Sequence, residues 1–392
     1  MRFPEFKDRL SNVKLSSLFK KCTQKNKDNQ VINVICNSAK NGLVPQRDFF
    51  DKDIANSENT SGYYIIQKQD FVYNPRKSNE APYGPISMYK YEEDGIVSPL
   101  YLCFRSIEPL CADFFETYFK SPAWYRYVYL MGDSGARHDR VSIKDDVFFD
   151  MPINVPSLPE QEKIAEFLSL IDERIEKQRQ LVDALKRYKR GLFLAIYSTR
   201  TVDWKRAKIR EYSKVLGGYA FDSKSYNSKG MYSIITIGNV SGNRYIDITN
   251  SSKILEIPAD IQSHQILHDG DIVISMTGNV GRVSIVKQTN CLLNQRVAKL
   301  NIEKPFIKEY IYQVLSSSNF EQEMSNAGQG AAQKNIKNTD IENFTFYLPQ
   351  EEQMIQRIAI TLQAIDGDIM YQESICSEIN RMKRGFLQQL FI

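Results

Sequence analysis

Residues 162–175 read EKIAEFLSLIDERI, and residues 356–369 read QRIAITLQAIDGDI. Ile, Ala, Leu and Asp recur at matched places, and each place in the second stretch lies 194 residues after its match. The similarity continues at the same offset into the basic endings RYKRGLF (187–193) and RMKRGFL (381–387). A duplication of this length indicates that the chain contains two copies of one structural unit.

The apolar residues of both stretches follow the alternating three- and four-residue spacing of a heptad repeat, which predicts two long helices that pack on each other. Both copies interrupt this seam with Gln and later with Lys, and polar seam residues fix the register of a coiled coil at a cost in stability. A simpler alternative is that each helix only caps its own domain. The seam residues are Ile164, Leu168, Ile171, Ile175, Gln178, Val182, Leu185, Lys189 and Leu192, matched by Ile358, Leu362, Ile365, Ile369, Gln372, Cys376, Ile379, Lys383 and Phe386.

The two helices divide the chain into four segments. We expect a globular domain over 1–156, a central spacer helix over 157–200, a second domain over 201–347 and a C-terminal spacer helix over 348–392. Runs of β-branched and aromatic residues with Gly or Asn-Gly punctuation predict strands in both domains. The expected fold class is therefore α/β, with two domains of mostly antiparallel sheet alternating with two long helices that pair as an antiparallel coiled coil.

The composition is that of an ordinary globular protein of 392 residues, with 42% hydrophobic and 25% charged residues. The net charge of +4 excludes a histone-like polycation but permits local basic faces. No apolar run approaches the roughly 20 residues that span a bilayer, and the N-terminus lacks a signal-peptide pattern, so we expect a cytoplasmic protein. The six cysteines show no C-x-x-C spacing, which indicates reduced thiols.

Several phrases of the sequence together resemble one known family, and the resemblance covers essentially the whole chain. They are LPEQEKIAEFLSLIDERI (158–175), LPQEEQMIQRIAITLQAIDGDI (348–369), LGGYAFDSKSYNSKG (216–230), GDIVISMTGNVGRV (270–283), LNQRVAKL (293–300) and GIVSPLYLCF (95–104). With the order domain, helix, domain, helix, the chain resembles the specificity (S) subunit of a type I restriction-modification system.

The resemblance implies a role without catalysis in this chain. Each globular domain would be a target recognition domain that reads one half of an asymmetric, bipartite site in double-stranded DNA, and the paired helices would set the gap between the halves. Two methyltransferase (M) subunits would bind the chain and methylate adenine, and motor-nuclease (R) subunits would join for restriction. S-adenosylmethionine, ATP and magnesium would serve those partners, while this chain would bind no cofactor, metal or membrane.

The sequence also lacks catalytic motifs of its own. It contains neither a G-x-x-x-x-G-K-[ST] phosphate loop nor an Asn/Asp-Pro-Pro-aromatic motif, and HQILH (264–268) lacks the Glu of a zinc-binding H-E-x-x-H. Two alternatives stay open. One is an enzyme that cuts or modifies DNA alone, which the missing motifs oppose. The other is a stand-alone coiled-coil DNA-binding or scaffold protein without methyltransferase partners; the divergence of the two domain interiors opposes a scaffold that has no DNA role.

Polar loops next to predicted strands supply the candidate DNA contacts. The guanidinium group of Arg can donate two hydrogen bonds to the edge of a guanine or to a phosphate, whereas the amides of Asn and Gln can form two hydrogen bonds with adenine. For any one of these residues, an ordinary solvated loop position is the simpler alternative. The candidates are Arg76, Lys77, Arg137, His138 and Arg140 in the first domain, and Asn279, Arg282, Asn294, Gln295, Lys334 and Lys337 in the second.

The repeated basic endings are candidates for binding partner subunits. Their lysines fall on the seam and their arginines point outward, so two similar surfaces could dock two similar partners. A local benefit from cations near a helix C-terminus is the simpler explanation. The candidate partner-binding residues are Arg187, Arg190, Arg381 and Arg384.

Overall fold

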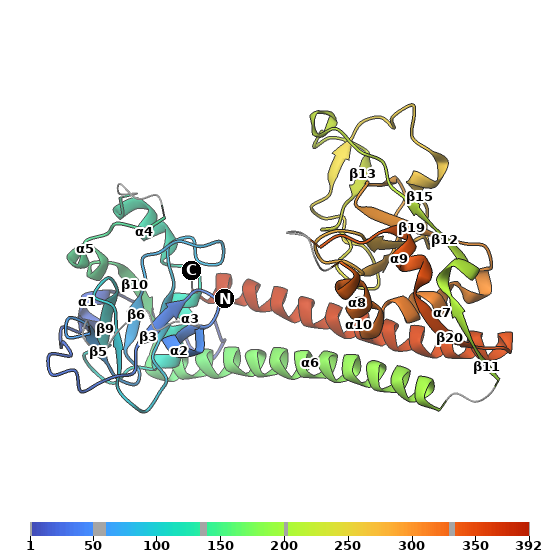
Figure 1. Ribbon diagram of the computed structural model, residues 1–392. Coiled ribbons are helices and arrows are strands. Elements are labelled where there is room, and N and C mark those ends of the chain that lie inside the picture. Colours follow the sequence, from blue (N-terminus) through green and yellow to red (C-terminus); the bar gives the residue numbers. More distant parts are fainter. Residues whose placement is uncertain (1, 50–59, 134–138, 200–202, 329–333, 392) are drawn as a thin grey trace. The chain divides into compact units, whose positions relative to one another are not determined.

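The chain forms two compact units, each built around one sheet-containing domain (Figure 1). Unit 1 consists of Met1–Gln178 together with Ile375–Ile392, and unit 2 consists of Arg179–Ser374. Each unit therefore includes part of both long helices. This computed structural model describes residues 2–49, 60–133, 139–199, 203–328 and 334–391.

Unit 1 is centred on an antiparallel sheet with the strand order β2-β9-β6-β7. Its strands are β1 (Ser11–Lys14), β2 (Phe19–Lys21), β3 (Ile35–Ser38), β4 (Gly42–Pro45), β5 (Tyr64–Ile66), β6 (Phe71–Tyr73), β7 (Ile86–Met88), β8 (Gly95–Val97), β9 (Leu102–Ser106) and β10 (Pro152–Val155). Its short helices are α1 (Leu15–Leu18), α2 (Gln46–Phe49), α3 (Ala112–Lys120), α4 (Tyr125–Met131) and α5 (Asp145–Phe149).

Aromatic rings fill the core of unit 1. Phe71 of β6 and Phe104 of β9 stack with ring centroids 5.6 Å apart. Phe115 of α3 meets Phe19 of β2 edge to face at 5.1 Å. Such pairs add to the burial of apolar area, so α3 is held against the sheet mainly by aromatic packing.

Unit 2 contains two four-stranded sheets, with orders β12-β19-β16-β17 and β14-β13-β18-β15. The strand pairs are antiparallel except β13 with β18. The strands are β11 (Trp204–Lys208), β12 (Ser213–Gly217), β13 (Tyr232–Ile235), β14 (Ser252–Ile254), β15 (Ile266–Leu267), β16 (Ile272–Ser275), β17 (Val283–Ile285), β18 (Cys291–Leu293), β19 (Val297–Ile302) and β20 (Thr345–Pro349). The short helices are α7 (Pro305–Leu315), α8 (Ser318–Ala327) and α9 (Asn338–Asn343).

The first and last strands of each domain pair with each other. In unit 1, β1 pairs antiparallel with β10, and in unit 2, β11 pairs antiparallel with β20. Each last strand leads directly into a long helix. The chain therefore enters and leaves each domain at one place.

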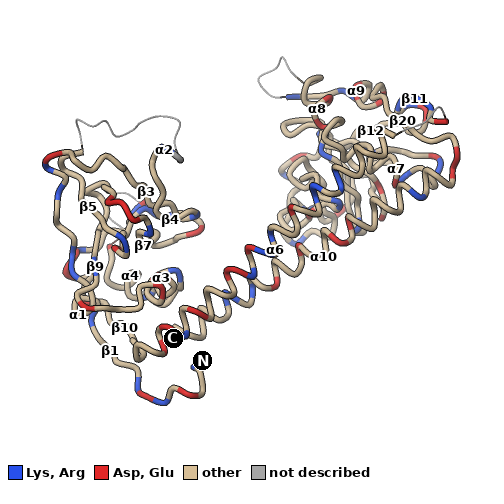
Figure 2. Tube along the Cα trace, turned by 90° about the horizontal axis from the view of Figure 1, so that it is seen from below, with Lys and Arg blue, Asp and Glu red and all other residues tan. Residues whose placement is uncertain are grey.

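The long helices are α6 (Leu158–Ser198, 41 residues) and α10 (Glu352–Leu390, 39 residues). They pair antiparallel, so the first part of α6 lies beside the last part of α10 in unit 1, and the reverse holds in unit 2 (Figure 1). Phe167 and Phe386 meet edge to face at 5.2 Å in unit 1. Acidic and basic residues alternate along both helices (Figure 2). The predicted fold class is confirmed.

Each unit is completed by the last turns of the helix that began in the other unit. Phe391, which directly follows α10, packs on Phe114 and Tyr118 of α3, at 5.4 and 5.7 Å between ring centroids. In unit 2, Tyr197 at the end of α6 packs on Trp204 at 6.0 Å. The alternative in which each helix only caps its own domain is therefore wrong.

Candidate nucleic-acid interface

Two predicted arginines of unit 1 lie directly opposite each other. Arg76 and Arg140 form an isolated antiparallel bridge. The Lys77 amide donates to the Asp139 carbonyl at 2.8 Å and the Val141 amide donates to the Pro75 carbonyl at 2.9 Å. Bonds that flank a pair in this way define a non-hydrogen-bonded pair, in which the side chains approach most closely.

The two arginines and Lys77 line one cavity of about 330 Å³. Arg76 is exposed, while Lys77 and Arg140 are half-buried. The other lining residues are Cys36, Asn37, Ser38, Ala39, Asn74, Pro75, Ser78, Pro85, Ser98, Leu100 and Tyr101. We call this the Arg76–Arg140 pocket. Two predicted contacts, Arg137 and His138, lie outside the described residues.

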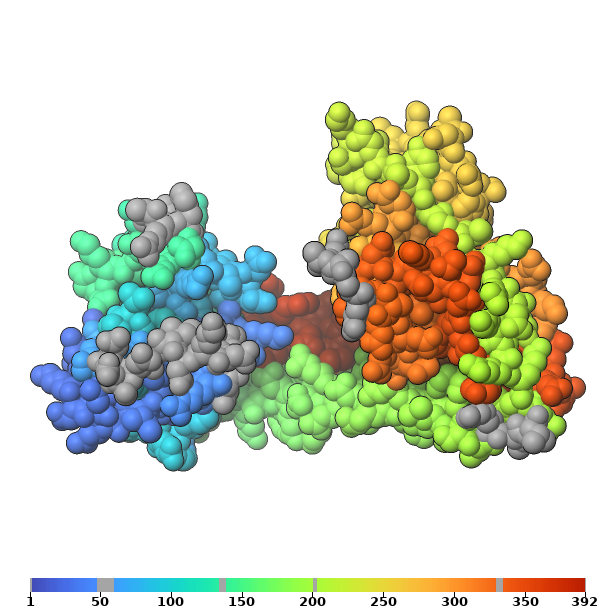
Figure 3. Space-filling view, in the orientation of Figure 1, coloured from blue at the N-terminus to red at the C-terminus, as the bar shows by residue number. Residues whose placement is uncertain are grey.

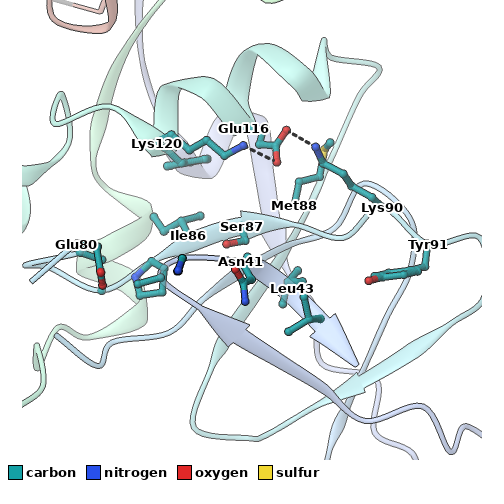
Figure 4. Close-up of a pocket in the computed structure, with 18 of the residues that line it drawn as sticks. Asn41, Leu43, Glu80, Ile86, Ser87, Met88, Lys90, Tyr91, Glu116 and Lys120 are labelled. Carbon is teal, nitrogen blue, oxygen red and sulfur yellow. Dashed lines mark ion pairs between the residues drawn. The ribbon is translucent and has the colours of Figure 1, made fainter. Parts of the chain in front are cut away.

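A larger cavity of unit 1, of about 440 Å³, has a different charge pattern. Two of its lysines pair with one acid: Glu116 accepts from Lys90 at 2.8 Å and lies 3.0 Å from Lys120 (Figure 4). Burial raises the pKa of Glu116, but the charges and hydrogen bonds of Lys120 and Lys90 outweigh it, so this pKa lies below its usual value. Two of the three lysines that line this cavity, Lys90 and Lys120, are therefore compensated within the protein.

In unit 2 the fold brings Asn279 and Lys334 to one cavity of about 350 Å³. The Gly278 amide donates to the Lys334 carbonyl at 3.0 Å, which holds the two loops together. Gly278 has a φ of +74°, a conformation that favours glycine. Arg282 points toward Glu321 of the same cavity wall, with Nε and Oε1 3.9 Å apart.

The remaining predicted contacts of unit 2 are placed elsewhere. Asn294 bridges to Tyr219, and the Gln295 amide donates to the Tyr219 carbonyl at 2.9 Å. Lys337 is exposed at the start of α9, where its amide donates to Asp340 at 2.7 Å. Neither Asn294, Gln295 nor Lys337 lines the cavity of Asn279 and Lys334.

A family model describing the type I restriction modification DNA specificity domain matches the chain twice, over residues 9–187 and 201–381. The chain belongs to this family. The family comprises the non-catalytic DNA-recognition subunits of type I restriction-modification systems, so the predicted family and the DNA-specificity role are confirmed.

Two specificity subunits of one archaeon resemble this chain over much of its length. One is the putative type I restriction enzyme MjaX specificity subunit of Methanocaldococcus jannaschii, which is 22% identical to this chain. The match covers 80% of this chain and 75% of that subunit. The MjaVIII specificity subunit of the same organism is 23% identical, over 62% of this chain and 62% of its own length.

Two solved structures share the fold across the whole chain. One comes from a study of complex assembly and conformational transition in the type I restriction-modification system, with TM-score 0.60, 16% identity and 98% of both chains covered. The other is the S subunit of such a system from M. genitalium, with TM-score 0.56, 13% identity and coverage of 100% of this chain and 99% of that one.

The candidate partner-binding arginines of this specificity subunit lie on the long helices. Arg187, Arg190, Arg381 and Arg384 are exposed, and Arg381 pairs with Glu378 of the preceding turn at 2.6 Å. Because α6 continues to Ser198, Arg187 and Arg190 lie about two turns or more before its end. The helix dipole acts within the last turn, so it does not explain this pair.

The seam lysines of the two repeats form reciprocal ion pairs. Lys383 contacts Asp172 at 2.5 Å in unit 1, and Lys189 contacts Asp366 at 2.6 Å in unit 2. Both Lys and Asp occupy repeat-related positions. The recurrence of Asp and Lys at one spacing in both copies is the sequence signal from which this pairing could have been inferred.

Asp366 belongs to a buried network that sequence reasoning missed. It also accepts from Arg244 at 3.1 Å and from Gln313 at 2.7 Å, and Arg244 makes two bonds of 2.8 Å to Glu309. Burial lowers the pKa of Arg244, but the carboxylate of Glu309 raises this pKa by more, so the guanidinium stays charged. The network joins the second domain to both long helices within unit 2.

The described residues contain no group of three or more His, Cys, Asp or Glu side chains arranged to hold a metal ion. Among the helices of that part of the chain, none is both long and apolar enough to cross a membrane.

Proposed function

We propose that the chain reads an asymmetric bipartite site in double-stranded DNA, one half with residues 1–156 and the other with 201–347, while the helices over 157–200 and 348–392 set the gap. The observation that carries this proposal is the double match to the specificity domain. Two copies of one scaffold with different interiors suit two different half-sites. Phosphate contacts would position each domain, and base contacts would specify the sequence.

The DNA contacts proposed for the first domain are the pocket residues Arg76, Lys77 and Arg140, together with Arg137 and His138. Those proposed for the second domain comprise the cavity residues Asn279 and Lys334, the neighbouring Arg282, and the separate positions Asn294, Gln295 and Lys337.

Mapping N6-methyladenine across a genome, in cells with and without this chain and with its partner subunits present, tests the reading role. We expect one bipartite motif that disappears with the chain. Replacing residues 1–156 by the first domain of another specificity subunit should change one half-site and leave the other intact. If both half-sites changed together, or if methylation were indifferent to the chain, the proposal would be overturned.

The chain is further proposed to recruit two adenine methyltransferase subunits, which would use S-adenosylmethionine, and motor-nuclease subunits, which would use ATP and magnesium. Repeat-related surfaces support two copies of one partner. Tyr188 and Met382 are exposed by 60% and 50% at matched positions, and arginines flank both. Figure 3 shows α6 at the surface of the molecule in green.

Native mass spectrometry of the chain with its methyltransferase counts the bound copies. The double substitution Arg187→Glu and Arg190→Glu should reduce two copies to one, because only one of the two surfaces is reversed in charge. The matched control is Arg174→Glu with Arg179→Glu, which alters two exposed arginines of the same helix outside the repeated ending. Two copies retained in a folded R187E/R190E variant would refute the docking role.

A further inference from the structure

The Arg76–Arg140 pocket carries more positive charge than its surroundings compensate, since Arg140 has one long ion pair and neither Arg76 nor Lys77 has an ion pair among the described residues. Its lining includes Arg76, Lys77 and Arg140, and among the described residues that line it there is neither Asp nor Glu. Asp139 is the acid nearest to Arg140, but its carboxylate is 4.0 Å from Nε and is 53% exposed. That distance is too long for a hydrogen bond.

The pairing of the two arginines makes this charge unfavourable in the unliganded protein. Side chains of a non-hydrogen-bonded pair project from one face with Cβ atoms about 5 Å apart, and like charges placed directly opposite are destabilising. In addition, Nε of Arg140 is enclosed by protein and has no hydrogen-bond partner among the described residues. A buried donor without a partner also costs free energy.

We propose that the Arg76–Arg140 pocket binds one phosphate group, held between the two guanidinium groups. A phosphate supplies the missing negative charge and accepts bidentate hydrogen bonds from arginine forks. A guanine edge would offer two acceptors but no charge, so it would leave the two like charges uncompensated.

The source of the phosphate rests on the proposed function: it is the backbone of bound duplex DNA. Backbone contacts fix the register and orientation of a protein on DNA without carrying sequence information. The pocket is therefore a positioning site of the first domain, distinct from the residues that read its half-site.

Salt dependence of DNA binding tests the shared phosphate. The full chain is titrated against a mixed-sequence duplex by fluorescence anisotropy over a range of NaCl concentrations, as wild type, R76Q, R140Q and R76Q/R140Q. The binding constant falls as salt is added, and losing one phosphate contact reduces the magnitude of the slope of log K against log salt by about 0.9. We expect that decrease in each single variant and no larger decrease in the double variant, because both arginines hold one phosphate.

The matched control is Lys68→Gln, which removes an exposed cation of unit 1 that pairs with Glu92 outside the pocket. Its slope should equal that of the wild type. A double variant with about twice the single decrease would mean two independent contacts and would overturn the shared site. Circular dichroism confirms that each variant is folded.

Inorganic phosphate provides the second arm. At constant ionic strength, replacing chloride by phosphate should raise the melting temperature of the wild type, because a ligand that binds only the folded state stabilises it. The R76Q/R140Q variant should show no such rise. A phosphate effect with unchanged DNA slopes would overturn DNA as the source, and the absence of both effects would overturn the pocket. A wild type that binds no duplex yet responds to phosphate would contradict the proposed function and leave the phosphate site standing.

Discussion

Asp172 and Asp366 occupy the same position of the two repeats but have different surroundings. Asp172 is 55% exposed and contacts Lys383, whereas Asp366 is 10% exposed and contacts Lys189, Arg244 and Gln313. Removing one partner of a buried pair costs about 3–5 kcal/mol, while an exposed pair contributes roughly 0–1 kcal/mol. The two repeat-related aspartates therefore contribute different amounts to the free energy of unfolding, although the sequence around them is duplicated.

We expect Asp366→Asn to lower the free energy of unfolding by about 3 kcal/mol, because Lys189 and Arg244 would keep their charges and lose a carboxylate. Asp172→Asn is the matched control and should cost less than about 1 kcal/mol. Urea denaturation of both variants measures the difference. Equal losses would show that the network around Arg244 contributes nothing beyond the helix pair.

Glu116 makes the stability of unit 1 depend on acidic pH. Its pKa is lowered in the folded protein because Lys120 and Lys90 outweigh burial. A carboxylate with a lowered pKa contributes stability above its unfolded pKa of about 4.3, and that contribution disappears as the pH falls through the folded value.

Wild type should therefore melt at a higher temperature than Glu116→Gln at pH 7, and the gap should close as the pH falls below about 4. Thermal melts from neutral to acidic pH report the gap. The exposed Glu80 of the same cavity provides the control, since Glu80→Gln should change the melting temperature little at any pH. A gap for E116Q that stayed constant with pH would contradict the role of its charge.

At the scale of elements, the end of α10 completes the aromatic core of unit 1. Phe386 contacts Phe167, and Phe391 contacts both Phe114 and Tyr118. Ending the chain at Gly385 removes Phe386 and Phe391, which are half-buried against the core of unit 1. A fully buried aromatic costs about 3–5 kcal/mol when it is lost, so we expect a smaller loss for each of the two and a destabilisation of unit 1 by several kcal/mol in total. Unit 2, which contains none of these rings, should keep its stability.

Hydrogen exchange resolved by residue distinguishes the two units in the truncated chain. We expect faster exchange in β6 and β9 and unchanged exchange in β16 and β19. Gln388→Ala, at an exposed position of the same helix end, is the control and should leave both units unchanged. Equal loss of protection in the two units would show that they unfold together.

The sequence predicts the long helices well because their apolar spacing is local and is written twice. It predicts the Arg76–Arg140 pocket only in part. GARHDR (135–140) and YNPRK (73–77) each indicate basic loops, but their pairing joins positions far apart in the chain, which no local pattern encodes. In unit 2 the loops of Asn279 and Lys334 converge, whereas Asn294 lies beside Tyr219, and composition alone does not distinguish these two outcomes.

At the scale of the whole molecule, each unit contains its own paired helix segments, with the unit boundary between Gln178 and Arg179 on α6 and between Ser374 and Ile375 on α10. The ion pairs of Asp172 and Asp366 lie inside the units, away from these boundaries. Extra residues placed at both boundaries should therefore preserve the pairing within each unit and lengthen only the connection.

Inserting four residues after Gln178 and four after Ser374 should change the gap between the proposed half-sites. Four helical residues add about 6 Å and rotate the chain by about 40° beyond a full turn. One base pair adds about 3.4 Å and about 35° of twist. The rotation caused by the inserted residues therefore matches one added base pair, whereas their length matches nearly two. Because the domains must still face their DNA grooves, we expect a gap longer by one base pair.

Methylation mapping of the insertion variant reports that gap directly, with both half-site sequences unchanged. Insertion after Gln178 alone is the control, because it shifts one helix against the other and must be absorbed by local unwinding. That variant should lose stability without gaining a defined new gap. If the double insertion kept the original gap with full methylation, the helices would not measure the distance, and the separation of the half-sites would have to be set by the recognition domains themselves.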